Sequence, residues 1–185
     1  MEWVLLGLVV AAVIWLVMTY NGLVAMRQRA AQAESDIDVQ LKQRHDLVPN
    51  LVETVKAYAG HERGTLESVI QMRNAAMSAA TPTDAAKNEQ ALTGALGRLI
   101  ALGEAYPDLK ANTNFQTLQT QLMDVENKLA ASRRFLNNSV SEYNAAIEAF
   151  PAALFARNFG FQPKTFYDVG ETQRQALDVA PTVKF

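Results

Sequence analysis

The hydrophobic pattern of the chain opens with one uninterrupted apolar run. From Trp3 to Tyr20 the sequence WVLLGLVVAAVIWLVMTY contains no charged residue. Eighteen helical residues at about 1.5 Å each span roughly 27 Å, which is close to the thickness of the hydrocarbon core of a bilayer. Trp3 and Tyr20 stand at the two ends of the run, where amphipathic rings favour the membrane interface. The pattern predicts a transmembrane anchor in residues 1–22.

A cleaved signal peptide is the competing interpretation of this segment, because Ala31-Gln32-Ala33 has the small-x-small form of a cleavage site. A signal peptide has a basic start and a short distance to its cleavage site. This chain has Glu2 near its start, and Arg27 and Arg29 lie between the run and Ala31. Both features favour a retained helix. The two arginines also predict a cytoplasmic domain and an outside N-terminus, since basic flanks stay inside.

After the anchor, the polar and apolar positions follow a helical period. A narrow apolar stripe continues the first helix through Val24, Ala30, Ala33, Ile37, Leu41 and Val48. Pro49 lacks an N–H and disfavours helical angles at the preceding residue, so it is predicted to end or kink this helix. A second helix is predicted from there to about Ala79, with Gly60 and Gly64 weakening its middle.

The second half of the chain predicts two further helices. Thr83 is expected to cap the first of them, which Tyr106-Pro107 closes. The last helix gives the clearest signal, because apolar side chains recur every three or four residues from Phe115 to Phe150, before Pro151. A helix of this length needs long partners. We therefore expect an all-α protein in which the membrane helix precedes an elongated antiparallel bundle of three to four long helices, in residues 23–162.

Aromatic residues crowd the sequence that follows Pro151, FPAALFARNFGF from Phe150 to Phe161. One interpretation is that Leu154, Phe155, Phe159 and Phe161 cap the open end of the bundle core. The other is a docking surface for a second protomer or for lipid. Residues 163–185 are predicted to form a tail that packs on the bundle or extends from it.

Composition narrows the classes of function. The chain has 185 residues and a net charge of -2, with 17 basic and 19 acidic residues and no basic tract, so nothing in it favours nucleic acid. Cysteine is absent, which excludes disulfides, thiolate metal sites and cysteine nucleophiles. Length allows the anchor and one domain of ordinary size.

Residues that could carry chemistry are few. The two histidines, His45 and His61, lie on opposite sides of Pro49 and form no metal-binding motif, so each is interpreted as a satisfied or exposed side chain. A metal-dependent enzyme or regulator would have to be built on Asp36, Asp38, Arg44, His45 and Asp46. On a helix the three acids and Arg44 are expected to spread over several faces as a solvated surface. No catalytic, cofactor-binding or metal-ligating residue is therefore assigned.

Several segments together resemble a known family. They are Tyr20-Asn21 with Leu23-Val24 and Arg27, SDIDVQLKQRHDLVPNLVETVKAYAGHE from Ser35 to Glu62, YPDLKANTNFQTLQTQLMDVENKLAASRRFLNNSVSEYNAAIEAFP from Tyr106 to Pro151, and Pro181, Val183 and Phe185. The chain resembles the LemA family over nearly its whole length, least so in residues 75–103. The resemblance implies a bacterial membrane protein with one membrane helix and a long-helix bundle. It supplies no enzymatic activity and no cofactor, while some members are associated with magnetosome membranes.

These observations favour a noncatalytic helical scaffold at the bacterial inner membrane, one that self-associates or docks a membrane protein partner. No nucleic acid and no small-molecule substrate are expected as partners. Small residues such as Gly7 and Ala11 could allow close helix contact within the bilayer. The alternative function is a membrane-organising or remodelling protein, for which Phe155, Arg157 and Phe159 are the candidate lipid-facing residues.

Overall fold

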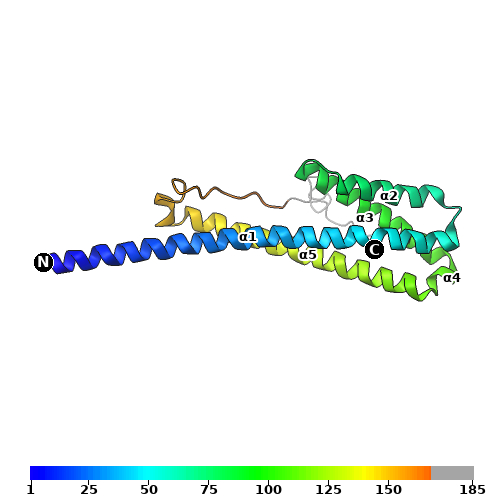
Figure 1. The fold of residues 1–185 in the computed structure, drawn as a ribbon, viewed down its shortest axis with the longest axis horizontal. Coiled ribbons are helices and arrows are strands. Elements are labelled where there is room, and N and C mark those ends of the chain that lie inside the picture. Colours follow the sequence, from blue (N-terminus) through cyan, green and yellow to red (C-terminus); the bar gives the residue numbers. More distant parts are fainter. Residues whose placement is uncertain (168–185) are drawn as a thin grey trace, which may run out of the picture. The chain divides into compact units, whose positions relative to one another are not determined.

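The computed structural model describes residues 1–167, and every regular element in this part of the chain is a helix (Figure 1). The elements are α1 (Glu2–Ala59), α2 (Arg63–Met77), α3 (Pro82–Ala105), α4 (Pro107–Lys110), α5 (Thr113–Glu148) and a short 3₁₀ turn, η1 (Ala152–Leu154). The predicted all-α class with a long apolar first helix is confirmed. The closing residues Pro181, Val183 and Phe185, with most of the predicted tail, lie outside the described residues.

The described chain forms two compact units. Unit 1 contains residues 1–39 and 129–167, and unit 2 contains residues 40–128. Helices α1 and α5 each contribute residues to both units. The tertiary contacts described below all lie within one unit or the other.

The first part of α1 is fully exposed despite its apolar sequence. An 18-residue window has a mean hydropathy of 2.3, and none of it is buried. Large apolar side chains such as Trp3 and Val9 are 83% and 60% exposed. A core helix of similar hydropathy would be covered by other elements. The N-terminal part of α1 is therefore long and apolar enough to cross a membrane, and the described fold leaves its 18-residue window unburied.

Pro49 does not end the first helix, although ending it was one of the two outcomes that the sequence predicted. It lies inside α1, which continues to Ala59. A proline has no N–H, so it cannot bond the carbonyl four residues earlier, which belongs to His45. That carbonyl instead accepts a hydrogen bond of 2.8 Å from Arg73 Nε on α2. A tertiary contact thus replaces the hydrogen bond that the proline removes, and this replacement could not be read from the local sequence.

The helix boundaries that follow also differ from the prediction. The expected second helix from Pro49 to Ala79 is interrupted, since α1 ends at Ala59 and α2 begins at Arg63. Gly60, which was expected only to weaken that helix, lies in the turn between them. Thr81, and not Thr83, caps α3: its Oγ1 accepts a hydrogen bond of 3.1 Å from the Asp84 N–H. Pro82 then occupies the first turn, a position where a missing N–H costs nothing.

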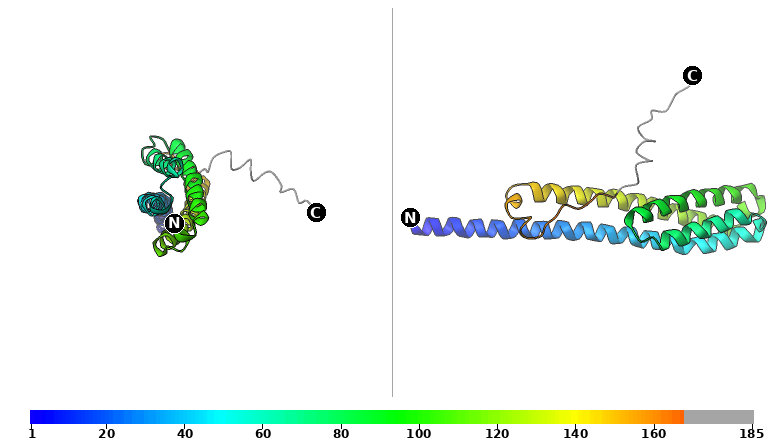
Figure 2. Two further views of the ribbon diagram at one scale, coloured as in Figure 1. Left: turned by 90° about the vertical axis from the view of Figure 1, so that its right-hand side faces the viewer. Right: turned by 90° about the horizontal axis from the view of Figure 1, so that it is seen from above.

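The core of unit 2 is built by α2 and α3 together with the adjoining parts of α1 and α5. In both views of Figure 2, α2 and α3 run side by side, and the Asn88 side-chain amide donates to the Ala75 carbonyl across the pair. Val55, Val69 and Leu99 are completely buried. Phe115 is also buried, with its ring so close to Gly103 that a Cβ atom there would collide with it. Gly103 therefore provides the space for an aromatic side chain.

In unit 1, α1 and α5 run antiparallel. Trp15 lies beside Phe150, whereas Arg29, further along α1, pairs with Glu142, earlier on α5. Leu23 packs in one core cluster with residues of α5 and of the chain after it: Tyr143, Ile147, Ala152, Ala156 and Phe161. The segment after α5 thus belongs to the fold of this unit.

The prediction for α5 is confirmed in its main features. The stripe from Phe115 to Ile147 is buried except at Leu118 and Ser132, which are half-buried. Lys128 pairs with Asp124 at 2.7 Å, one helical turn away. The helix ends at Glu148, ahead of Pro151. The last member of the predicted stripe, Phe150, is an exception, because 73% of it is exposed.

Candidate functional site

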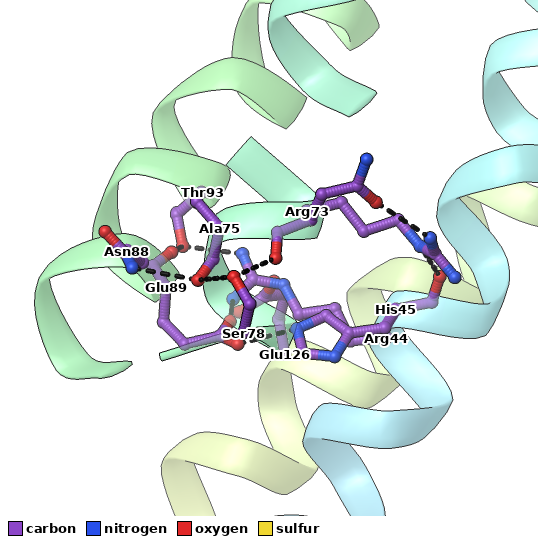
Figure 3. A network of polar contacts seen from close by, with 10 residues as sticks. Arg44, His45, Arg73, Ala75, Ser78, Asn88, Glu89, Thr93 and Glu126 are labelled. Carbon is purple, nitrogen blue, oxygen red and sulfur yellow. Dashed lines mark hydrogen bonds and ion pairs between the residues drawn. The ribbon is translucent and has the colours of Figure 1, made fainter. Parts of the chain in front are cut away.

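A buried polar network in unit 2 brings together the best candidates for chemistry (Figure 3). Its centre is Arg44 of α1, which is only 1% exposed. Arg44 Nη1 donates to Glu89 Oε2 at 2.9 Å, and Nη2 donates to Thr93 Oγ1 at 2.6 Å. Its Nε lies 2.8 Å from Glu126 Oε1, an ion pair in which the N–H direction does not meet hydrogen-bond geometry. One guanidinium therefore connects α1 with α3 and α5.

His45 completes this network from the same helix. Its Nε2 lies 2.6 Å from Glu89 Oε1, a hydrogen bond in which the role of the ring nitrogen depends on the tautomer. Thr93 Oγ1 accepts from Arg44 and donates to the Glu89 carbonyl at 3.0 Å. Both oxygens of Glu89 and the hydroxyl of Thr93 are thus engaged inside the protein. The arrangement links three helices through polar side chains.

The acids proposed from sequence do not join this network. Asp36, Asp38 and Asp46 are exposed, as expected of a solvated helix surface, whereas Arg44 is buried, contrary to that expectation. His45 is buried and paired with Glu89, which agrees with its interpretation as a satisfied side chain. Asp46 accepts a hydrogen bond of 2.6 Å from Lys42. This ammonium group holds the pKa of the Asp46 carboxyl below its ordinary value near 3.8, and partial desolvation opposes the shift. The five residues therefore form no common site.

Sequence analysis missed Glu89, the residue that makes the burial of Arg44 possible. Glu89 lies 44 residues beyond His45 along the chain, and an acid in the first half of an amphipathic helix is usually solvated. Its position in α3 does offer a signal. Glu89 precedes Leu92 and Leu96 by three and seven residues, so it lies on the apolar face of its own helix.

Unit 1 presents a second candidate site, which we call the aromatic surface. It consists of residues of α1 and of the loop after α5: Trp15, Leu16, Val17 and Tyr20, with Phe150, Leu154, Phe155 and Phe159. Trp15 and Phe150 have ring centroids 5.9 Å apart, and the Tyr20 and Phe159 rings are 5.7 Å apart. An apolar groove of about 330 Å³ runs between the two segments. The surface is therefore shared by the membrane-length helix and the C-terminal loop.

The structure divides the aromatic residues that were predicted to cap the core. Phe161 does so, being only 2% exposed, with the Arg27 guanidinium 5.1 Å from its ring centroid. Leu154 and Phe159 do not, since they are 71% and 62% exposed. Phe155 is half-buried against the core cluster. The capping interpretation is thus correct for part of the segment, and the rest remains available for contact.

Two asparagines of α5 hold the chain beyond the loop, and we call this arrangement the amide clamp. The Asn144 side chain accepts from the Lys164 N–H and donates to the Lys164 carbonyl, both at 2.9 Å. Asn137 makes the same pair of contacts with Tyr167, at 2.8 and 3.2 Å. Seven helical residues rise roughly 10.5 Å, and three extended residues span roughly 10 Å, so the two spacings match. Sequence analysis identified no role for either residue.

Comparison with known proteins decides the family. The model described as the LemA family matches residues 33–185. The chain belongs to the LemA family.

The curated relatives of this chain include magnetosome proteins named MamQ and a protein named LemA. The chain is 27% identical to magnetosome protein MamQ of Magnetospirillum gryphiswaldense over 184 residues, covering 85% of this chain and 68% of the relative. It is 26% identical to magnetosome protein MamQ 2 of Paramagnetospirillum magneticum, with 86% and 68% covered. Protein LemA of Metamycoplasma hominis is 23% identical, with 86% and 74% covered.

Membership in the LemA family fits a noncatalytic, membrane-associated protein. The exposed apolar part of α1 provides a helix that could span a membrane. In unit 2, the buried charges of this LemA-family chain bond to one another. Both features agree with a protein that acts through its surfaces.

Proposed function

We propose that the chain is a membrane-anchored, noncatalytic scaffold of the bacterial inner membrane, which self-associates or docks a membrane protein partner. The observation that carries this proposal is the exposed apolar part of α1. The same helix continues into the folded units, so an anchor there would attach the whole domain to the membrane. Under this proposal residues 1–22 are the anchor, residues 23–162 the helical domain and residues 163–185 a C-terminal tail.

The polar network supports a structural role for the interior of the domain. Arg44, His45 and Glu89 are buried and bonded to one another, so they link helices. A catalytic acid or base must instead reach a reacting group directly or through a water molecule. We therefore place the function on the outer surfaces of the helices.

The membrane orientation follows from the charges that flank the anchor. Arg27 and Arg29 follow the apolar run, and Glu2 precedes it. Because basic residues near a membrane helix remain on the cytoplasmic side, the domain is proposed to be cytoplasmic and Met1 to lie outside. A protease added to intact spheroplasts should then leave the domain uncut and digest it after lysis.

The decisive experiment for the scaffold is chemical cross-linking of the full-length chain in native membranes. Gentle detergent extraction, mass photometry and identification of co-purifying proteins would follow. A discrete assembly larger than one chain, or one stoichiometric partner, is the expected result. Recovery of a lone monomer without companions would contradict the scaffold.

A matched variant tests the anchor separately. Val9→Lys with Val13→Lys adds two charges near the centre of the run, each costing about 2.5–3.5 kcal/mol in membrane insertion. The variant is expected to leave the membrane fraction and to lose the assembly. Persistence of the variant in carbonate-washed membranes would contradict the proposed anchor.

A further inference from the structure

We propose that the aromatic surface is a lipid-contacting site: the loop from Phe150 to Gly160 inserts its exposed apolar side chains into the bilayer beside α1. The occupant is the membrane itself, at the boundary between headgroups and acyl chains. This inference rests on the proposed anchoring of α1, and it assigns a second membrane contact to residues far from the anchor in sequence.

The positions of Trp15 and Tyr20 along α1 indicate how deep the loop lies in the membrane. Trp15 precedes Tyr20 by five residues, which corresponds to roughly 7 Å along a helix. If the span ends at Tyr20, Trp15 lies well below the interface. The Phe150 ring centroid is 5.9 Å from that of Trp15, so Phe150 has to lie at a similar depth. The Phe159 ring, beside Tyr20, then lies at the interface.

The composition of the loop suits this position. Between Ala149 and Pro163 the only charged residue is Arg157. Phe150, Leu154 and Phe159 are 73%, 71% and 62% exposed, which is unusual for three large apolar side chains in one short segment facing water. Arg157 is exposed too, and its long side chain can extend to lipid phosphates while its stem stays among apolar groups.

The backbone of the loop satisfies much of its own hydrogen bonding, as entry into lipid requires. The Ala156 N–H donates to the Ala152 carbonyl at 2.7 Å, and the Phe161 N–H donates to the Ala156 carbonyl at 2.9 Å. The Phe159 N–H donates to the Phe155 carbonyl at 3.1 Å. Tightly turned backbone of this kind lowers the cost of removing the loop from water.

Continuity with the anchor favours lipid over a soluble protein partner. Leu16, Val17 and Tyr20 of α1 line one side of the groove, and Phe155 and Phe159 line the other. The surface is thus an extension of the exposed face that the anchor turns towards lipid. A soluble partner bound here would have to enter the membrane beside Trp15.

The absence of cysteine makes a site-directed test straightforward, since each introduced thiol is unique. Spin labels are attached to four full-length variants, Leu154→Cys, Phe159→Cys, Val9→Cys and Phe135→Cys, in nanodiscs that hold one copy in phosphatidylethanolamine and phosphatidylglycerol. Phe135 is the matched control, because it is an aromatic residue of α5 that is 48% exposed. Collision rates with oxygen, which partitions into lipid, and with a water-soluble nickel chelate are measured for each label.

The expected result is a ratio of oxygen to nickel collisions that is several-fold higher at Leu154 and Phe159 than at Phe135. If both labels match Phe135 while the Val9 label lies in lipid, the lipid-contacting site is overturned and the anchor stands. A Val9 label that is open to the nickel chelate overturns the anchor itself. Protection from both reagents only when two copies share a disc would overturn the lipid site in favour of contact between copies.

A second variant tests the loop without placing a label on it. Leu154→Glu with Phe159→Glu should expose a label at Phe150→Cys to the nickel chelate, with a several-fold rise in its collision rate. Phe135→Glu, the control substitution, should leave that label unchanged. An unchanged Phe150 label in the double variant would overturn the proposal.

Discussion

The two units of the domain treat their polar and apolar groups in opposite ways. Unit 2 buries polar groups: Arg44, His45 and Glu89 lie in its interior, where Arg44 and His45 both contact Glu89. Unit 1 exposes apolar surface, with Phe150 and Leu154 each more than two-thirds accessible. In unit 1 the two asparagines of the amide clamp instead form hydrogen bonds with backbone groups. A buried ionic network fixes one helix arrangement, whereas an exposed aromatic surface has to be covered by something else.

The contrast separates two kinds of effect that substitutions should have. Changes in unit 2 should lower the free energy of unfolding without altering membrane contact. Changes on the aromatic surface of unit 1 should alter membrane contact with little effect on unfolding. Chemical unfolding of the full-length chain in detergent, followed by circular dichroism at 222 nm, measures these changes in stability unless another method is named.

The largest effect is expected for Arg44→Met. It removes the cation from a network in which Glu89 is only 4% exposed, and an uncompensated buried charge costs about 3–5 kcal/mol. Arg29→Met, in unit 1, breaks an ion pair whose side chains are more than half exposed and should change stability by less than about 1 kcal/mol. Equal effects of the two variants would remove the distinction between buried and surface charge.

A smaller loss is expected for Gly103→Ala. The added methyl group would collide with the buried Phe115 ring, and overpacking of this kind costs about 1–3 kcal/mol. Gly97→Ala is the control in the same helix, because nothing lies within 4 Å of its added Cβ. Higher helix propensity should stabilise that variant by up to about 1 kcal/mol. Stabilisation by both substitutions would show that the Phe115 ring has room to move.

The contact of Arg73 with the helix that contains Pro49 should be worth about 1–2 kcal/mol. Arg73→Met leaves the His45 carbonyl without its donor, and an unsatisfied buried acceptor has a cost of this size. In a Pro49→Ala background residue 49 can donate to that carbonyl itself, so the cost of Arg73→Met should shrink. A double-mutant cycle measures this coupling. Strict additivity would mean that the two residues do not share the carbonyl.

Asn144→Ala should release the chain near Lys164 at a cost of about 1 kcal/mol. Both side-chain contacts to that backbone are lost, so amide exchange at Lys164 should become faster while exchange in unit 2 stays unchanged. Hydrogen-exchange mass spectrometry measures both regions in one experiment. Asn138→Ala is the control, since that neighbouring side chain is exposed.

The smallest effect concerns Asp46 and pH. Since its pKa is lowered in the folded chain, the stabilisation is present above the ordinary carboxyl pKa and is lost as pH falls through the lowered value. The group is fully exposed, so the change in unfolding should lie within experimental error. Lys42→Gln should raise the pKa of Asp46 towards its ordinary value, as measured by carboxyl NMR titration. A pKa that did not move would contradict the ion pair.

Sequence patterns predicted the helices of this fold better than their junctions. The apolar run from Trp3 to Tyr20 and the stripe of α5 are dictated by periodicity alone, and both are found. The effect of Pro49 was wrongly predicted because the group that satisfies the freed carbonyl, Arg73, comes from another helix. The cap of α3 was misplaced by two residues, since both threonines in Thr81-Pro82-Thr83 are competent caps.

The candidate sites were predicted only where local sequence carries the information. The aromatic crowding after Pro151 was visible, but the division between buried Phe161 and exposed Phe159 depends on tertiary packing. The Arg44 network combines residues from three helices, and a single sequence gives no sign of which acid meets which base. The amide clamp was invisible for the same reason, because its partners are backbone groups that every residue possesses.

The amide clamp limits how the sequence of the segment after the loop, residues 164–167, can vary. The clamp asparagines contact the N–H and carbonyl of Lys164 and Tyr167, which are the same in all residues except proline. The clamp itself therefore tolerates changes of side chain in residues 164–167, but two of these side chains make contacts of their own. Lys164 Nζ pairs with Glu34 Oε1 at 2.9 Å, and the Arg133 guanidinium lies 5.1 Å from the Tyr167 ring centroid. The two asparagines have no such latitude, since aspartate lacks the donor and glutamine is longer by a methylene group. Evolutionary constraint from the clamp itself therefore falls on the two helix asparagines.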